Sequence, residues 1–353
     1  MLRPFHLRDL PLVLRLSEHG ASLHSESALI NDVHPLRGAL FNLFVGGEYP
    51  TYVWRAENGE GAGFIQLHLK EEGHRGHILY VGSTANAAAE DTAVAVEEAD
   101  NQYTWVNEDV WLPLLEQAVV EVGQRGIHSL IAEVSETGPE LVILRQAGFA
   151  VYTRQDIWTL NEHDQINDAS VAVTLQPRRP VDDWDIQLLY ANIVPRLVQL
   201  VEPLPPLETG KAWVLREGNE LTAFVHLNAG ETATWLRLFI HPNAESRAEE
   251  ITQAALQLCP YKPTHPLFCS VPRYQSWLQG VLQRCGFAFW DSQAVMVKHT
   301  VHHLRRPLPE LTAVLESQGI TASSPIVQQY YHPETNGHGN GRKAVFRFRH
   351  RAN

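Results

Sequence analysis

The sequence predicts an α/β (α+β) protein of two domains built on one plan, each a mixed, mostly antiparallel sheet flanked by helices. The first observation is a repeat: residues 141–160 pass from an apolar helical pattern through a glycine into a β-rich run, and residues 278–298 do the same. The second is an upstream echo, in which residues 52–69 resemble residues 212–229. The third is the length of 353 residues, which gives each copy enough chain for its own core. A repeat constrains the whole fold and outweighs any single local signal.

Glycines and phenylalanines mark equivalent positions in the two copies. Gly148 and Gly286 each follow the last expected helical residue, where a left-handed cap favours glycine. Phe64 and Phe224 are expected on equivalent strands. The interval from Phe64 to Phe224 is longer than the interval from Gly148 to Gly286, so the first copy carries extra residues between these landmarks. We assign them to the acidic, small-residue segment 82–107, which is expected to be a loop or a short extra element.

The first copy is expected to open with a strand, two helices and a three-stranded meander. Asp9 is the expected N-cap of the first helix, and Pro11 suits its first turn. Asn58 and Gly59 predict a hairpin turn within the meander. The segment 20–34 is polar and is predicted to be a loop. The expected elements are a strand at 2–6, helices at 10–17 and 35–44, and strands at 51–56, 63–69 and 77–81.

A helix, a strand and the repeated helix-to-strand unit complete the first copy. Asp109 is the expected cap of a helix over 110–122, whose apolar residues form one wide stripe. A buried strand is predicted at 127–134, and Pro139 suits the start of the next helix. The first domain is therefore expected to span residues 1–160.

The remaining boundaries follow from changes in composition. Residues 161–170 are polar without periodicity and predict a linker, so the second domain is expected at 171–300. Residues 301–333 are expected to form a C-terminal extension with a short helix. Residues 334–353 form a basic tail with Gly-Asn repeats, which favours disorder, and this tail could contact a partner.

The second copy is expected to repeat the elements of the first. Its first helix is predicted at 183–200, with Trp184 and Leu188 among the apolar residues. The other expected elements are strands at 211–216, 221–228 and 234–241, a helix at 245–258, a strand at 267–271 and a helix at 273–284.

The composition argues against several classes of protein. The formal net charge of −12 disfavours nucleic acid or an anionic membrane as a partner of the folded body. The three cysteines have no metal-like or CxxC spacing and indicate reduced thiols, and no apolar run reaches the ~18 residues of a membrane span, so a cytoplasmic protein is expected. His299, His302 and His303 have a spacing that suits metal ligands on a helix, but no cysteine or carboxylate accompanies them. No metal is therefore expected.

The order of the expected elements and the L-R-Q-A-G-F ending of the repeated helix resemble the GNAT superfamily of acyl-CoA-dependent N-acetyltransferases. The resemblance covers most of residues 1–300, as a tandem pair of GNAT-like domains. It implies acetyl-CoA or another acyl-CoA as co-substrate, and an amine acceptor that is a small molecule or a peptide.

The resemblance also implies a place for the CoA pyrophosphate, where a glycine-rich loop opens a helix and its backbone N–H groups bind the anion. Neither copy keeps the glycine pattern. In the second copy the key positions hold Glu245, Ala248 and Glu250. The carboxylates of the two glutamates would repel a pyrophosphate. The helix start of the first copy is therefore preferred. The residues assigned to the cofactor are Leu79, Val81, Val106, Asn107, Asp109 and Val110.

The catalytic residues are less well marked. The family often has a tyrosine four residues before the glycine of the Gly-Phe pair, and here Leu144 and Leu282 take its place. An amine must lose a proton before it attacks a thioester, and Glu133 and Tyr80 are the catalytic candidates in the first copy. The candidates to contact the acceptor are Glu26, Asp32 and His34.

Two hypotheses about function remain open. In the first, one domain is an N-acyltransferase and the other is a degenerate copy, as the preserved order of elements indicates. In the second, both copies have lost the site and the protein is a non-catalytic binding or scaffolding module, as the loss of both glycine loops and both tyrosines indicates. The fold alone does not decide between them.

Overall fold

The computed structural model describes most of the chain between residues 2 and 300. The predicted turn at 58–59, nearly all of segment 82–107, the linker beyond its first residue and both C-terminal segments lie outside the described residues, as do Asp32 and His34. The described stretches are 2–18, 20–31, 35–45, 49–56, 61–70, 74–84, 106–161, 173–207, 210–259 and 265–300.

The secondary structure alternates helices and strands in the expected order. In the part before the linker, the N-terminal half, the strands are β1 (Leu2–Pro4), β2 (Gly20–Ser22), β3 (Thr51–Arg55), β4 (Ala62–Lys70), β5 (Arg75–Ser83), β6 (Ser129–Ser135) and β7 (Ala150–Leu160). In the part after it, the C-terminal half, they are β8 (Gln176–Pro177), β9 (Lys211–Glu217), β10 (Glu220–Ala229), β11 (Thr234–Ile240), β12 (Leu267–Pro272) and β13 (Ala288–His299).

The helices fall between these strands. The N-terminal half contains α1 (Leu10–Ser17), α2 (Ser25–Ile30), α3 (Pro35–Val45), α5 (Glu108–Gln124) and α6 (Pro139–Gln146). The C-terminal half contains α7 (Asp183–Ile193), α8 (Arg196–Gln199), α9 (Ala248–Leu258) and α10 (Leu278–Arg284). Short 3-10 turns lie at η1 (Leu7–Asp9), η4 (Pro180–Asp182), η5 (Pro242–Arg247) and η6 (Arg273–Gln275).

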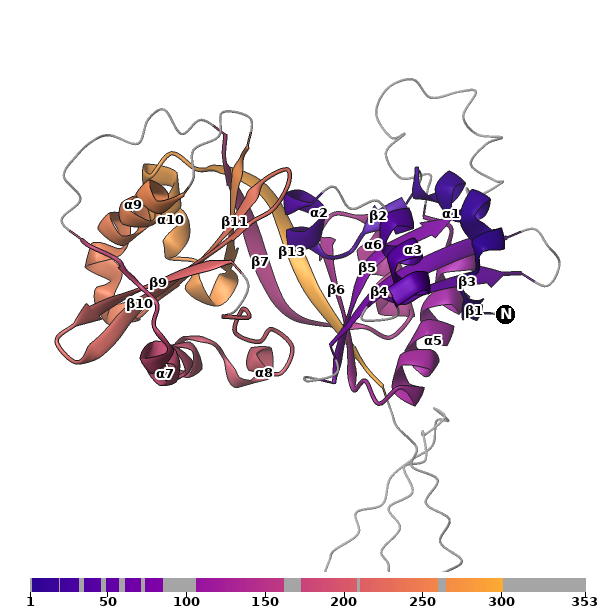
Figure 1. Cartoon of the computed structure of the whole chain (residues 1–353), viewed down its shortest axis with the longest axis horizontal. Helices are drawn as coiled ribbons and strands as arrows, with labels where there is room; N and C mark the ends of the chain where they lie inside the picture. Colours follow the sequence, from indigo (N-terminus) through magenta and orange to yellow (C-terminus); the bar gives the residue numbers. More distant parts are fainter. Residues whose placement is uncertain are drawn as a thin grey trace, which may run out of the picture. The chain divides into compact units, whose positions relative to one another are not determined.

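All the described strands belong to one 13-stranded sheet, in the order β1-β3-β4-β5-β6-β13-β7-β12-β11-β10-β9-β8, with β2 paired to β5 (Figure 1). Only β5 with β6 and β11 with β12 run parallel; the other pairs are antiparallel. This confirms the predicted mixed, mostly antiparallel sheets flanked by helices.

The two halves exchange their last strands. β7 follows α6 of the N-terminal half but pairs with β12 of the C-terminal half, where Leu160 lies opposite Leu267. β13 follows α10 of the C-terminal half but pairs with β6 of the N-terminal half. β7 and β13 also pair with each other, so they form the centre of the sheet (Figure 1).

The exchange has approximate twofold symmetry. Gln155 and Gln293 face each other across β7 and β13, and their spacing along the chain equals the spacing of the two repeat glycines. Each strand carries a bulge that leaves one residue out of the pairing, Tyr152 in β7 and Trp290 in β13. These two bulged residues are separated by the same interval again, so the repeat extends to the irregularities of the strands.

Each half has its own core, completed by a strand of the other. Trp111, Leu114 and Leu115 of α5 are fully buried against the N-terminal meander, and Met296 of β13 joins them. Trp158 of β7 lies in the corresponding core under α9 and α10.

Phe64 and Phe224 lie on equivalent strands, as the echo predicts. Phe64 is in β4 and Phe224 is in β10, each the middle strand of its meander. Phe64 packs with α1, and Phe224 packs with buried residues of α7. These helices cover the opposite face of the sheet from α5 and α9, because neighbouring residues of a strand point to opposite faces.

Three local predictions are wrong. The segment 20–34 contains β2 and α2 rather than only a loop: β2 pairs with β5, and the His24 side chain accepts a hydrogen bond from the Ser27 N–H at the start of α2. Asp9 does not cap α1 with its side chain, because its carboxylate pairs with Arg3 at 2.5 Å. Asn107, not Asp109, caps α5, since its side chain accepts from the Asp109 N–H at 3.1 Å.

The helix predicted over 183–200 is broken in two. α7 ends at Ile193 because the residue before Pro195 is held in an extended conformation, and α8 begins after that proline. Trp184 and Leu188 are exposed, while Ile186, Leu189 and Tyr190 of α7 are buried.

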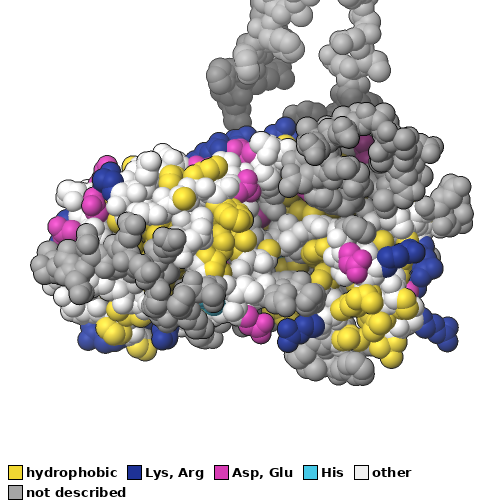
Figure 2. Space-filling view, turned by 90° about the horizontal axis from the view of Figure 1, so that it is seen from above, with side chains coloured by type: hydrophobic (Ala, Val, Ile, Leu, Met, Phe, Trp, Pro, Cys, Tyr) yellow, Lys and Arg dark blue, Asp and Glu magenta, His cyan; other side chains and the backbone are white. Residues whose placement is uncertain are grey.

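Figure 2 shows one face of the molecule on which hydrophobic side chains gather in several places, with acidic and basic side chains scattered between them.

Replacement of Met296 by alanine tests the strand exchange. The residue belongs in sequence to the C-terminal half but fills the N-terminal core, so Met296→Ala should lower the free energy of unfolding by roughly 2–5 kcal/mol. Native-state hydrogen exchange should show the lost protection in β6 and α5. Gln283→Ala, at an exposed position of α10, is the control and should change little. Loss of protection confined to β12 and α10 would contradict the exchange.

Candidate functional site: a cavity shared by the two halves

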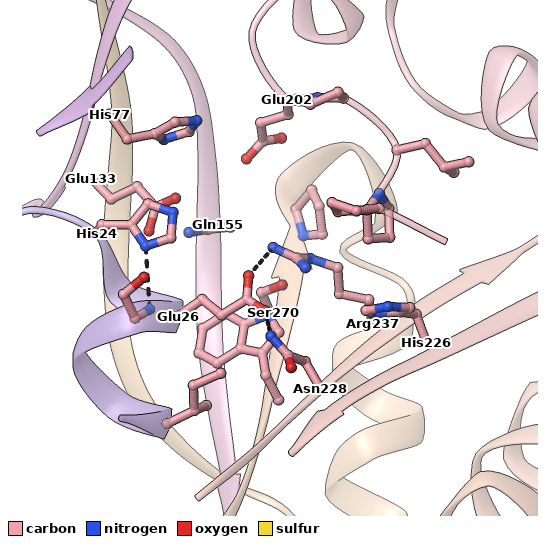
Figure 3. A pocket seen from close by; sticks show the side chains of 18 of the residues that line it. His24, Glu26, His77, Glu133, Gln155, Glu202, His226, Asn228, Arg237 and Ser270 are labelled. Atoms are coloured by element: carbon pink, nitrogen blue, oxygen red, sulfur yellow. Dashed lines mark hydrogen bonds and ion pairs between the residues drawn. The ribbon is translucent and has the colours of Figure 1, made fainter. Parts of the chain in front are cut away.

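A cavity of about 380 Å³ lies where the two halves meet (Figure 3). Its walls come from α2, β5 and β6 on one side, and from β11, β12 and the segment after α8 on the other. Gln155, at the centre of the exchanged pair of strands, also lines it. The cavity therefore depends on the same exchange that joins the halves.

In the N-terminal half the chain itself fills the gap between β5 and β6. These strands pair only where Arg75 to His77 meet Ser129 to Ile131, and then they separate. β2 lies in the gap and pairs with β5, and Leu23 continues the contact by donating its N–H to the Leu79 carbonyl at 3.0 Å. The Leu23 carbonyl accepts in turn from the Glu133 N–H at 2.8 Å.

Glycine permits the close approach of β2. A Cβ atom at Gly20 would lie 2.7 Å from the Val81 carbonyl oxygen, so a larger residue would push the strands apart. The backbone edge at Leu79 and Val81, two residues predicted to hold the cofactor, is therefore already covered by β2 and Leu23.

In the C-terminal half the corresponding gap is open. β11 pairs with β12 only from Thr234 to Leu236, and beyond Leu236 no described strand occupies that side of β11. Arg237 and Phe239 of β11 line the cavity, as does Ser270 of β12. The two copies thus differ at the same place in their fold, one filled and one open.

An ion pair links the halves at the wall of the cavity. Arg237 of β11 donates to the Glu26 carboxylate of α2 at 2.5 Å, and the Asn228 amide donates to the same carboxylate at 2.7 Å. Burial alone would raise the pKa of Glu26, but Arg237 and Asn228 hold that pKa below its usual range. Glu26, predicted to contact the acceptor, lines the cavity and orients Arg237.

Two further carboxylates line the cavity, those of Glu133 and Glu202 (Figure 3). Burial raises the pKa of Glu202 to about 7, the negative charge of Glu133 adds to the shift, and Arg237 opposes it. The Glu133 carboxylate accepts from the Ser25 N–H at 2.8 Å. Glu202 is therefore poised to exchange a proton near neutral pH.

The two catalytic candidates from the sequence lie in different places. Glu133 lines the cavity, as its predicted role requires. Tyr80 is not among the residues that line it: its hydroxyl donates to the Ser17 carbonyl at 2.8 Å and its ring stacks on Phe64. Burial raises the pKa of Tyr80 to about 12. Glu133 and Tyr80 therefore do not form a pair.

The remaining cofactor candidates cluster at the start of α5. Asn107 caps the helix and donates to the Thr84 carbonyl, Asp109 follows the cap, and Val110 is buried in the core with Val106 packed against it. None of them lines the central cavity. At the equivalent helix start of the C-terminal half, Arg residues already pair with the glutamates: Arg284 with Glu249 at 2.8 Å, and Arg247 with Glu250 at 3.6 Å.

Two charged residues that line the cavity, Arg237 and Glu202, were not predicted from the sequence. Arg237 is the one charged residue in the strand TWLRLFI, and a lone charge in an apolar strand needs a buried partner, so the signal was present. Glu202 lies between Val201 and Pro203 in an irregular segment, where no periodicity indicates which way a side chain points.

In the described part of the chain, no group of three or more His, Cys, Asp or Glu side chains is arranged to hold a metal ion. Among the described helices, none has the length and apolar character needed to cross a membrane.

Comparisons with known proteins identify the fold. Neither a protein-family model nor a curated protein sequence matches the chain. A glucosamine N-acetyltransferase region of a fungal multi-domain β-N-acetylglucosaminidase superposes with a TM-score of 0.52 at 12% identity, covering 84% of this chain and 38% of that one. The chain therefore has the fold of GCN5-related N-acetyltransferases, arranged as two GNAT-like halves, as the sequence predicts.

Two further solved structures match over nearly their whole length. A tandem GNAT protein from the clavulanic acid biosynthesis pathway has a TM-score of 0.48 at 13% identity, covering 85% of this chain and 98% of that one. A GCN5-related N-acetyltransferase from Sphaerobacter thermophilus has a TM-score of 0.49 at 10% identity, covering 85% of this chain and 95% of that one.

Glu202→Gln tests the environment of the cavity through the pH dependence of stability. Because the folded protein holds the Glu202 proton up to about pH 7 and the unfolded chain loses it near the usual glutamate value, wild-type stability falls as pH rises between those limits. Glutamine does not titrate. In calorimetry, the melting temperature of the variant should therefore be about 2 °C or more above that of wild type at pH 8. At pH 4.5 the two melting temperatures should differ little. An equal difference at both pH values would contradict the raised pKa.

Proposed function

We propose that the chain is an acyl-CoA-dependent N-acyltransferase in which the C-terminal half holds the acyl donor and the central cavity holds the amine acceptor. The observation that carries the proposal is the difference between the halves. The gap between β5 and β6 is filled by β2, whereas the gap between β11 and β12 is open and leads into the cavity. This reverses the preference for the N-terminal half that the sequence suggested.

The open side of β11 suits the extended arm of an acyl-CoA. An extended ligand adds to a free strand edge through main-chain hydrogen bonds, as a further strand does. Residues 238–240 offer such an edge next to Arg237, at the wall of the cavity. β5 offers none without displacement of β2, so only one half is expected to bind the donor.

The side chains around the cavity fit the chemistry of acyl transfer. The acceptor amine loses a proton, its nitrogen attacks the thioester carbonyl, and the carbon–sulfur bond breaks to release the CoA thiolate. Glu202, with a pKa of about 7, takes the proton of the amine. Tyr274 lines the same cavity, and because burial raises its pKa its hydroxyl stays protonated and can donate a hydrogen bond to the departing CoA thiolate, which leaves as the anion.

A second candidate function is non-catalytic binding of a small molecule in the same cavity. The observation that favours it is the helix start of the C-terminal half, where residues 242–250 contain no glycine and Glu245 is exposed. A CoA pyrophosphate would find few unobstructed N–H groups there. Release of CoA from acetyl-CoA in the presence of an amine distinguishes the two functions, because only the transferase produces it.

Hydrogen exchange with acetyl-CoA tests where the donor binds. Acetyl-CoA should slow amide exchange in peptides that cover residues 237–240, because the arm of the ligand pairs with that edge. Peptides that cover residues 79–82 serve as the internal control and should not change, since β2 already covers them. Protection at 79–82 in place of 237–240 would contradict the assignment of the donor to the C-terminal half.

A pair of matched substitutions tests the same assignment by charge. Asn243→Asp adds a negative charge at the exposed start of η5, and should weaken acetyl-CoA binding about two- to fivefold in calorimetric titrations. Asn107→Asp adds the same charge at the start of α5 and keeps a good N-cap, so binding should not change. If only Asn107→Asp weakens binding, the donor lies in the N-terminal half.

A further inference from the structure

Two buried N–H donors line the central cavity and have no partner among the described residues. They are the indole Nε1 of Trp235, a residue 2% exposed, and the amide Nε2 of Gln275, a residue 3% exposed. A buried donor without a partner costs about 1–3 kcal/mol, so such groups are normally satisfied in the state that functions. Both donors belong to the C-terminal half, and together they indicate a hydrogen-bond acceptor on whatever fills the cavity.

The charges around the same cavity do not balance. Besides four histidines (His24, His68, His77 and His226), the charged residues of the described part that line it are Glu26, Glu133, Glu202 and Arg237. Arg237 pairs with Glu26 and its charge also acts on Glu202, so one strong base serves three carboxylates. Glu133 lines the cavity near enough to Glu202 for its negative charge to help raise the pKa of Glu202, so a positive charge between the two carboxylates would be stabilised by both.

Aromatic rings complete the walls. Tyr190, Phe239 and Tyr274 line the cavity near Glu202, and Tyr190 stacks edge-to-face on Phe239 with ring centroids 6.0 Å apart. Aromatic faces attract an organic cation and exclude an anion. The volume of about 380 Å³ is at the small end of ligand cavities and suits a small molecule rather than a length of polypeptide.

We propose that this cavity binds a small primary amine in its ammonium form, with the ammonium between Glu133 and Glu202 and a carbonyl-type acceptor of the same molecule on Trp235 and Gln275. The inference rests on the proposed function in so far as it identifies the acceptor substrate. It narrows that acceptor to a small cationic molecule with an acceptor atom, which the charges favour over an anion and the cavity volume favours over a length of polypeptide.

The test is calorimetric titration of the full-length chain without acyl-CoA, so that it reports on the cavity alone. The probe is 4-(aminomethyl)benzamide, a rigid aromatic molecule with an ammonium group at one end and a carbonyl at the other. 4-Methylbenzamide lacks the ammonium and should bind at least about tenfold more weakly. Benzylamine lacks the carbonyl and should bind several-fold more weakly. Equal binding of 4-methylbenzamide, or no binding of the probe at 10 mM (about 2.7 kcal/mol of affinity), would overturn the proposal.

Variants assign each end of the probe to its residues. Trp235→Phe keeps a buried ring but removes the N–H. It should weaken the binding of 4-(aminomethyl)benzamide several-fold and leave the binding of benzylamine unchanged. Glu202→Gln should weaken the binding of both amines by about tenfold and leave the binding of 4-methylbenzamide unchanged. If Trp235→Phe weakens both amines equally, the acceptor contact is wrong; circular dichroism checks that each variant is folded.

The outcome separates this inference from the proposed function. Binding of the probe without any CoA release from acetyl-CoA would refute the transferase and leave the cation site in place. Acyl transfer to a peptide or to an anionic amine, without binding of the probe, would refute the cation site and leave the transferase in place.

Discussion

The structure depends on the pairing of β7 with β13. Each of these strands follows a helix of one half and completes the sheet of the other, so neither half has a finished sheet or a finished core without its neighbour. The approximate twofold symmetry of the exchange brings β6 and β12 to matching positions on either side of the pair. Consequently the strand pairs β5–β6 and β11–β12, each of which could line a separate site, border one shared cavity.

The shared cavity is asymmetric because local sequence differs between the copies. Gly20 lets β2 approach β5 closely enough to fill the gap in the N-terminal half, and α2 then carries Glu26 across to Arg237 of the C-terminal half. In the C-terminal half the equivalent gap stays open, and Glu202 lines the cavity together with Glu133. One copy has therefore become a wall of the site, and the other keeps the free strand edge that a donor needs.

The sequence predicts the part of this architecture that local patterns encode. The Gly-Phe unit, the meander with Phe64 and Phe224, and the wide apolar stripe of α5 all appear as expected. The strand exchange could not be predicted, because a strand that completes its own half and one that completes the other half have the same local pattern. β2 and α2 were missed because short elements depend on tertiary pairing, whereas the break at Pro195 was visible in the sequence. Glu133 was found from its strand, but its partner Glu202 comes from an irregular segment of the other half.

The most direct test of the account is a crystal structure of the chain with acetyl-CoA bound. We expect the pantetheine arm to lie along residues 238–240 of β11, with the acetyl group at the cavity near Glu202 and with β2 still paired to β5. Acetyl-CoA bound along β5 with β2 displaced, or bound away from both gaps, would contradict it.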